Sequence, residues 1–466
     1  MEKSKNTSRR KFLENSAAIG ALGAIGVSQI LKSCQSGSQW SPIAMPTLLE
    51  EAPDGQPLRA GVIGCGGRGT GAAANFLAAG PNLSITAVAD TFQDRIDSFI
   101  ERTTSREDAP DLSNIQTFAG LDGYKRLLDE ADVDVIITAT PPYFRPAVFQ
   151  AAVDAGKHVF MEKPVAVDAP GCRQIMAAAR QAEAAGLKVQ TGTQRRSGRD
   201  YLDIYAAVAG GAIGDIVSYN MYWNGGKLWH YNPRPEMSEL ENMIRNWVNW
   251  IWLSGDHIVE QHVHNLDVAN WFSGQGHPVK AAFGMGSRQR RVTGDQFDNF
   301  SIDFIYDEEV HMHSMCRQIN DCANYVGEYI RGTKGYTNCS DTIWNPDGSV
   351  MYETDTFTVE TVETARGTRE RRTLARSHMD QEHINLVTAI RTGEPLAAGE
   401  ATAMSTLTAV MGRTAAYTGK EVTWDEMMAS TETMGPALED LVMGDVDISG
   451  EIPVAGAEVD PIASGR

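Results

Sequence analysis

A strand that runs into a glycine-rich turn constrains the fold more than any other part of this 466-residue chain. The apolar run Leu58–Gly64 predicts a buried strand, and a helix of small residues is expected over Thr70–Ala79. The turn between them has the spacing G-x-G-x-x-G, which permits a tight bend, a close approach of a pyrophosphate and close packing of helix on strand. Free N–H groups at the start of the helix favour phosphate. We therefore expect a dinucleotide site that uses Gly64, Gly66 and Gly69.

The segments that follow alternate between apolar strands and helices. Further strands are expected over Ser84–Asp90, Val133–Thr140, His158–Met161 and Lys188–Thr191, with helices over Pro146–Ala155 and Cys172–Ala185. Near-continuous apolar strands of this kind are typical of a parallel sheet covered on both faces. Residues 58–195 are therefore predicted to form a doubly wound α/β domain of the Rossmann type.

The pattern changes after Arg195 to longer strands with alternating polarity. These are expected over Ile216–Trp223, Val279–Met285, Phe300–Tyr306 and Val310–Cys316. The acidic turn at residues 307–309 predicts an antiparallel hairpin from the last two. Residues 196–435 are thus interpreted as an α+β domain with a large open, mostly antiparallel sheet. Its helices at His378–Arg391 and Ala401–Tyr417 are expected to pack back on the first domain, and residues 436–466 form a tail.

The first 34 residues have the pattern of an export signal. Arg9-Arg10 precedes the apolar run Ala17–Leu31, which is shorter than the ~20 residues of a membrane span. The twin-arginine route carries folded proteins, so a cofactor would be bound before export. We expect a periplasmic protein, or one anchored at the envelope by a lipid on Cys34, although Lys32 fits a lipidation signal poorly. Residues 35–57 are a linker.

The net charge of −19 excludes a broad surface for nucleic acid or anionic lipid and favours a small-molecule substrate. The six cysteines contain no C-x-x-C pair, so neither a zinc ribbon nor a redox dithiol is indicated. Buried thiols are preferred over a disulfide between Cys316 and Cys322.

Several polar residues follow the predicted strands of the first domain. Asp90 ends the second strand, where a carboxylate accepts hydrogen bonds from a ribose, which favours NAD; Arg68 inside the turn leaves NADP open. Thr140-Pro141-Pro142 and Glu162-Lys163-Pro164 each end a strand at the carboxyl edge of the sheet, where such folds bind ligands.

With these motifs and the block Gln190–Ser197, residues 58–420 resemble the family of glucose–fructose oxidoreductase, inositol dehydrogenase and MocA proteins. The resemblance implies that Lys163 lies beside the nicotinamide and the reacting hydroxyl. It also implies cofactor contacts from Thr140, Pro141, Glu162 and Gln194, a carbohydrate substrate and a homo-oligomer. Relatives often carry histidine where this chain has Arg145.

A third motif is Glu260, His264 and Asp267, which match the family's acid–histidine–acid spacing. The resemblance implies that His264 exchanges a proton with the substrate hydroxyl. On one helix Glu260 and His264 share a face, so the carboxylate is expected to orient the imidazole. His262 replaces a usual glycine and brings a second imidazole near the substrate. Glu260, His262 and His264, with His257, could instead bind a metal, but alternate positions share a face only on a strand; no metal is predicted.

Residues 219–252 are dense in tyrosine and tryptophan. Aromatic rings of this kind suit stacking on a sugar, and equally a core or a subunit interface. Tyr222, Trp223 and Arg245 are the candidate substrate residues.

Together these features predict an NAD(P)-dependent oxidoreductase that acts on a sugar or glycoside and holds its cofactor tightly. A redox-neutral NAD-dependent glycoside hydrolase or lyase is the alternative, because the same residues serve transient oxidation, elimination and water addition. A non-catalytic sugar-binding protein is the third hypothesis, disfavoured by the presence of both Lys163 and His264.

Overall fold

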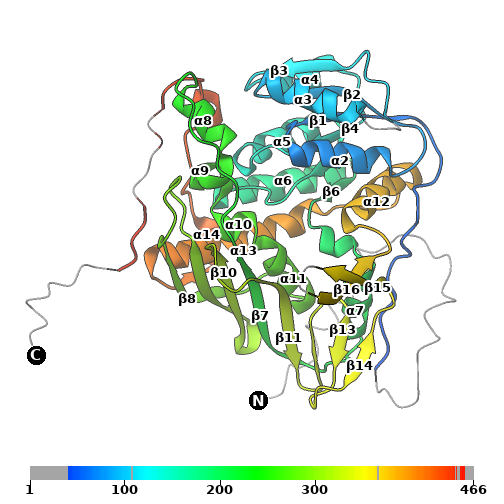
Figure 1. Cartoon of the computed structure of the whole chain (residues 1–466), viewed down its shortest axis with the longest axis vertical. Coiled ribbons are helices and arrows are strands. Elements are labelled where there is room, and N and C mark those ends of the chain that lie inside the picture. Colours follow the sequence, from blue (N-terminus) through cyan, green and yellow to red (C-terminus); the bar gives the residue numbers. More distant parts are fainter. Residues whose placement is uncertain (1–39, 106–108, 365–366, 447, 449–451, 457–466) are drawn as a thin grey trace, which may run out of the picture.

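The computed structural model describes residues 40–105, 109–364, 367–446, 448 and 452–456, which form two layered domains (Figure 1). The expected export signal and Cys34 lie outside the described residues. None of the described helices is long and apolar enough to cross a membrane.

The first domain is a six-stranded parallel sheet with the order β3-β2-β1-β4-β5-β6. Its strands are β1 (Leu58–Ile63), β2 (Leu83–Asp90), β3 (Gln116–Ala119), β4 (Val135–Thr138), β5 (His158–Met161) and β6 (Val189–Thr191). Its helices are α2 (Gly67–Leu77), α3 (Gln93–Thr104), α4 (Gly123–Glu130), α5 (Arg145–Asp154) and α6 (Ala169–Ala184), with 3₁₀ turns η2 (Pro142–Phe144) and η3 (Gln194–Ser197). Strand β4 is buried along its whole length, as expected for a sheet covered on both faces. The predicted doubly wound sheet is confirmed.

The second domain is built on a nine-stranded sheet with the order β14-β13-β12-β11-β7-β10-β9-β8-β17. The strands are β7 (Ile216–Gly225), β8 (Lys280–Ser287), β9 (Asn299–Tyr306), β10 (Val310–Gln318), β11 (Tyr325–Gly332), β12 (Tyr336–Thr337), β13 (Thr342–Trp344), β14 (Val350–Glu353) and β17 (Val422–Thr423). Only β7 and β10 pair in parallel, so the predicted mostly antiparallel sheet is confirmed. The predicted hairpin is β9–β10, closed by η5 (Asp307–Glu309).

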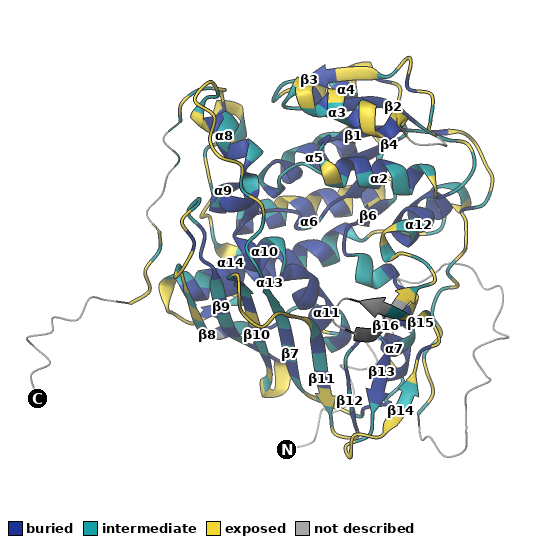
Figure 2. Ribbon diagram, in the orientation of Figure 1, coloured by how far each residue is buried: buried dark blue, intermediate teal, exposed yellow. Residues whose placement is uncertain are grey.

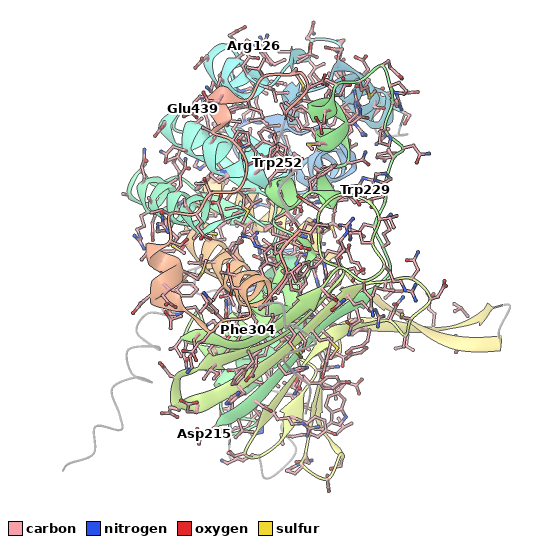
Figure 3. All side chains as sticks on the ribbon, turned by 90° about the vertical axis from the view of Figure 1, so that its left-hand side faces the viewer. Arg126, Asp215, Trp229, Trp252, Phe304 and Glu439 are labelled. Atoms are coloured by element: carbon pink, nitrogen blue, oxygen red, sulfur yellow. The ribbon has the colours of Figure 1, made fainter. Side chains whose placement is uncertain are left out.

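Two further strands, β15 (Phe357–Thr364) and β16 (Gly367–Leu374), pair only with each other. This hairpin projects from the side of the molecule (Figure 3, yellow). The helices of this half of the chain are α7 (Arg199–Ala209), α8 (Glu239–Arg245), α9 (Ile251–Ser254), α10 (His257–Glu260), α11 (Val263–Ser273), α12 (His378–Thr392), α13 (Gly399–Thr418) and α14 (Trp424–Ala429), with η4 (Trp247–Asn249) and η6 (Leu438–Asp440).

Helices α12 and α13 join the two domains. Helix α12 packs on α2 and β6 of the first domain, whereas α13 lies between α6 and β8. The buried residues gather along this joint (Figure 2). Arg413 of α13 is buried there and donates hydrogen bonds from Nη1 to the carbonyl oxygens of Val167 and Gly255, at 2.8 and 2.9 Å. One guanidinium thus ties backbone from both domains.

Cys316 and Cys322 do not pair. Cys316 is buried on β10, while Cys322 is exposed, and the five cysteines of the described residues are all free thiols.

His383 of α12 is buried against the aromatic core of the first domain. Its ring centroid is 4.2 Å from that of Phe160, and neither ring nitrogen has a hydrogen-bond partner among the described residues. Burial, with a smaller effect of the charge on Arg68, lowers the pKa of His383 to about 3. The folded protein therefore holds this imidazole neutral where an unfolded chain, with a pKa of about 6.5, protonates it.

We expect His383→Phe to reduce the acid sensitivity of the fold. Between about pH 6.5 and the folded pKa the unfolded state binds more protons, so stability falls as pH falls. The wild-type protein should lose about 2 kcal/mol through this residue between pH 7 and pH 5, and the variant should not. Urea unfolding at both pH values measures the difference. His313→Phe, on the outer face of β10, is the control, and an unchanged pH dependence in His383→Phe would contradict the assignment.

Candidate functional site

The glycine-rich turn between β1 and α2 has the geometry of a pyrophosphate cradle. Gly64 has φ +95°, and a Cβ there would lie 2.8 Å from backbone atoms of Ala139 and Thr140. A Cβ on Gly69 would lie 1.8 Å from the Gly64 carbonyl oxygen, whereas one on Gly66 would meet nothing within 4 Å. Helix α2 begins without a side-chain cap or an acidic residue in its first turn. Its N–H groups are therefore available to a phosphate.

Asp90 ties the end of β2 to this turn. Its carboxylate accepts hydrogen bonds from the backbone N–H groups of Cys65 (2.7 Å) and Phe92 (3.0 Å). Burial raises the pKa of Asp90, while these two N–H groups oppose the shift. Each carboxylate oxygen has a second lone pair that can accept a further hydrogen bond. The predicted contact with a ribose hydroxyl is therefore compatible with these two bonds.

Arg68 and Glu162 form an ion pair across the same edge of the sheet. Arg68 Nε lies 2.5 Å from Glu162 Oε1, and a Cβ on Gly192 would lie 2.4 Å from Glu162 Oε2. Within the described structure, Arg68 Nη2 is buried without a partner. A dinucleotide phosphate or ribose fits this unpaired donor, so the residues present suit the cofactor that the motif predicts.

Thr140, Pro141 and Gln194 lie in the loops at the same carboxyl edge, after β4 and β6. The Thr140 carbonyl oxygen accepts a hydrogen bond from Arg145 Nε at 2.9 Å. Arg145 is buried and also donates to the Pro164 carbonyl oxygen, so it braces the loops after β4 and β5. Burial lowers the pKa of Arg145 to about 10, against the charges of Glu162 and Glu260. In the sequence Arg145 stands where relatives often carry histidine, and no role could be predicted for it from that difference.

Lys163 meets Glu260 of the second domain. The Lys163–Pro164 peptide is cis, and Lys163 Nζ donates to the Glu260 carbonyl oxygen at 2.5 Å and to Glu260 Oε1 at 3.1 Å. Both side chains are 13% exposed, so the ion pair is largely screened from solvent. The lysine and the acid of two separate motifs thus form one unit.

The expectation that Glu260 orients His264 is wrong for this structure. Helix α10 ends at Glu260 and α11 begins at Val263, so the two residues do not share the face of one helix. Glu260 instead binds Lys163, and the His264 ring stacks on Trp223 with centroids 5.6 Å apart and planes at 19°. Burial, then the charges of Lys163 and Arg195, lower the pKa of His264 well below its usual range. The lowered pKa keeps the imidazole neutral, the form in which a histidine acts as a base, and it also makes this imidazole a weaker base than a free histidine.

Tyr222 and Trp223, both predicted to bind substrate, point to opposite faces of the sheet. Trp223 shares the face of His264, whereas Tyr222 pairs with Tyr325, 5.7 Å away, on the other face. Neighbouring side chains on a strand alternate, so only one of them can face the site. Tyr222 is corrected to an outer-face residue.

His262 is a structural residue. It is fully buried, with Nδ1 3.2 Å from Asn265 Oδ1 and Nε2 2.7 Å from Ser314 Oγ, so neither nitrogen is left for a substrate. Burial lowers its pKa to about 3, partly offset by the bond to Asn265. The alternative metal set is not assembled either, since no group of three or more His, Cys, Asp or Glu among the described residues could hold a metal ion.

Arg245 also departs from its expected role. Its guanidinium binds both carboxylate oxygens of Asp94 at 2.9 and 3.0 Å and Glu241 Oε1 at 3.0 Å. These contacts occupy the donors that a substrate hydroxyl would use. Arg245 therefore bridges to the start of α3 instead of lining the substrate site.

The aromatic stretch divides between the core and the surface. Trp252 is buried against Tyr143, with ring centroids 4.9 Å apart, whereas Trp229 is 42% exposed (labelled in Figure 3).

Sequence reasoning assigned no role to two buried ion pairs beside the site. Arg195 binds Glu328 of β11, and Arg196 binds both carboxylate oxygens of Asp267 at 2.8 and 2.9 Å. Glu328 also accepts from Asn265, the partner of His262. The two consecutive arginines after Gln194 indicated that acidic partners were needed. These partners are too distant in the sequence to be identified from residue spacing.

Comparison with known proteins agrees with this geometry. Residues 58–191 match the family described as "Oxidoreductase family, NAD-binding Rossmann fold". A "Glycosyl hydrolase family 109 protein" of Shewanella pealeana is 27% identical over 241 residues, which are 51% of this chain and 49% of that protein. "Inositol 2-dehydrogenase 1" of Saccharopolyspora erythraea is 33% identical over 139 residues, 30% of this chain and 40% of that protein. The chain spans about half or less of the length of these curated relatives.

The crystal structure of scyllo-inositol dehydrogenase from Lactobacillus casei, with bound NAD(H) and scyllo-inositol, has the same fold. It is 18% identical, with a TM-score of 0.57 over 80% of this chain and 100% of that one. The family that residues 58–191 match is an oxidoreductase family with an NAD-binding fold, which agrees with the enzyme class and the cofactor that the motifs predict. Residues 58–191 thus match the oxidoreductase family with an NAD-binding Rossmann fold, and the two domains together have the fold of the glucose–fructose oxidoreductase, inositol dehydrogenase and MocA dehydrogenases, as the motifs predicted.

Proposed function

We propose that this protein is an NAD-dependent oxidoreductase that acts on a sugar or glycoside and keeps its cofactor tightly bound. The observation that carries the proposal is the contact of Lys163 with Glu260 at the carboxyl edge of the Rossmann sheet, with His264 near enough for the lysine charge to lower its pKa. Lysine and imidazole together suit proton exchange with a substrate hydroxyl. The relative with bound scyllo-inositol and NAD(H) supports a polyhydroxylated substrate.

In the oxidation direction, the hydroxyl proton passes to the neutral Nδ1 or Nε2 of His264, and a carbonyl replaces the hydroxyl. When bound, NAD supplies the two-electron acceptor for the carbon that bears the hydroxyl. Lys163 places a positive charge beside the oxygen as negative charge develops on it. Glu260 holds that amine, and Trp223 holds the imidazole by stacking.

Protein purified without added nucleotide should carry about one NAD per chain. Outside the cytoplasm there is no pool of soluble NAD, so an exported enzyme that released its cofactor could not replace it, and tight binding keeps the protein loaded. Acid release followed by absorbance measurement gives the amount. Mixing the protein with a panel of inositols, aldoses and methyl glycosides should produce absorbance at the reduced nicotinamide band. A protein that neither holds nor binds NAD would contradict the proposal.

Replacement of the site residues should separate chemistry from cofactor binding. Lys163→Ala and His264→Asn should each lower turnover by about 10³-fold while NAD affinity changes little, because acid–base groups contribute about this much. Glu260→Gln should cost only about tenfold, since its carbonyl oxygen still accepts from Lys163. Lys125→Ala, on the exposed face of α4, is the control. Full turnover in Lys163→Ala would remove the lysine from the mechanism, whereas a wild-type protein that binds sugar without any change in its nicotinamide would favour the non-catalytic hypothesis.

The redox-neutral hydrolase is a second candidate, and the likeness to the glycosyl hydrolase family 109 protein favours it. In that route, transient oxidation acidifies the neighbouring C–H, the aglycone leaves by elimination, and water adds before the electrons return. The same lysine and histidine would serve it.

Reaction of nitrophenyl glycosides in D₂O distinguishes the two functions. A hydrolase should release nitrophenol without lasting nicotinamide reduction and should incorporate deuterium at the carbon beside the oxidised one, because that proton exchanges with solvent. An oxidoreductase should accumulate reduced nicotinamide and release no nitrophenol. Deuterium-free hydrolysis would exclude the elimination route.

We propose that residues 1–34 direct the folded, cofactor-loaded protein through the twin-arginine route, that it remains in the periplasm or on a lipid at Cys34, and that it forms a homo-oligomer. The sequence pattern of the first residues and the resemblance to the family support this.

A further inference from the structure

Residues 226–250, here called the cap, link β7 to α9 and form a rigid unit. Three asparagine side chains hold its loop to its helical part. Asn246 exchanges hydrogen bonds with the backbone of Tyr231 at 2.7 and 3.0 Å, Asn249 donates to the Trp229 carbonyl oxygen at 3.1 Å, and Asn242 accepts from the Arg234 N–H at 3.0 Å. A loop with its backbone bonded in this way keeps one shape.

The cap reaches the first domain through Arg245. Besides its two bonds to Asp94, the guanidinium carbon lies 3.9 Å from the centroid of the Phe92 ring. The Arg245 side chain is 14% exposed and that of Asp94 is 65% exposed. A bidentate ion pair with an aromatic ring beneath it is stronger than an ordinary surface pair.

This contact lies at the adenosine end of the predicted cofactor site. Phe92 donates its backbone N–H to Asp90, the residue placed to accept from the ribose, and Asp94 follows in the first turn of α3. In a Rossmann domain the adenosine half of the dinucleotide lies over this end of the second strand. The first domain and the cap together line a half-open cavity of about 210 Å³ there, bordered by Asp94, Arg95, Tyr231, Asn242 and Arg245 among others.

The C-terminal tail holds the cap from its other end. The tail is fixed to the body where the Met434 N–H donates to Asp168 Oδ2 at 2.8 Å and Tyr143 Oη donates to the Pro436 carbonyl oxygen at 2.6 Å. Farther along, the Gly444 carbonyl oxygen and Asp445 Oδ1 accept from the first N–H groups of α8, at 3.2 and 3.3 Å. The tail thus reaches α8 (Figure 1, red) and satisfies donors that a helix start leaves open.

We propose that the cap closes over the adenosine end of the bound dinucleotide and that the Arg245–Asp94 contact slows its release. The inference rests on the proposed NAD-dependent function and gives the tight retention a structural cause. Arg245 is a positioning residue in this account: it acts through Asp94 and Phe92 and not on the reacting atoms.

The test is the rate at which NADH leaves the full-length protein. Protein loaded with NADH is mixed with excess NAD⁺, and the loss of bound-NADH fluorescence gives the dissociation rate. Arg245→Ala and Asp94→Asn should each raise this rate about tenfold, which corresponds to ~1.4 kcal/mol. Asp94→Glu, which keeps the carboxylate, should return the rate most of the way to wild type.

Arg199→Ala is the matched control, because it breaks an exposed ion pair with Asp203 on α7. Its dissociation rate and melting temperature should equal those of wild type. A wild-type rate in Arg245→Ala, or an Asp94→Glu variant as fast as Asp94→Asn, would overturn the inference. Absence of NADH binding to the wild-type protein would instead overturn the proposed function.

Discussion

The contact between Lys163 and Glu260 holds the candidate site together. The two residues are 97 positions apart and belong to different domains. Glu260 ends α10, and the last carbonyl groups of a helix have no partner within it, so the carbonyl oxygen is free to accept from the lysine amine. In the first domain, the residue before Lys163 is Glu162, which binds Arg68 of the glycine-rich turn. In the second domain, Glu260 is four residues before His264 in the sequence. Cofactor turn, lysine and imidazole therefore have fixed relative positions.

The charges around the site are balanced in pairs. Arg68 binds Glu162, Lys163 binds Glu260, Arg195 binds Glu328 and Arg196 binds Asp267. Arg145 is satisfied by the carbonyl oxygens of Thr140 and Pro164 instead. Paired carboxylates lower the cost of keeping several cations in a poorly solvated place. His264, with no carboxylate bound to it among the described residues, is left as the neutral group that can take up a proton.

The sequence was most informative where the physical signal is local. The strand, the glycine spacing and the helix of the first βα unit are neighbours in the chain, so their geometry could be predicted. The sequence could not show that Glu260 and His264 contact different residues, because the break between α10 and α11 depends on tertiary contacts. The partner of Arg245 lies 151 residues away, and no spacing rule finds it. The opposite orientation of Tyr222 and Trp223 could have been predicted, since strand alternation alone requires it.

The buried guanidinium of Arg413 has a consequence for how substrates are selected. Its two acceptors, the carbonyl oxygens of Val167 and Gly255, belong to different domains. Swinging the domains apart would strand a cation in the interior, at a cost of several kcal/mol. These two hydrogen bonds therefore oppose separation of the domains at this joint. Because a changed joint would expose this cost, new specificities are reached more readily through changes in surface loops that leave Arg413 and its two acceptors intact.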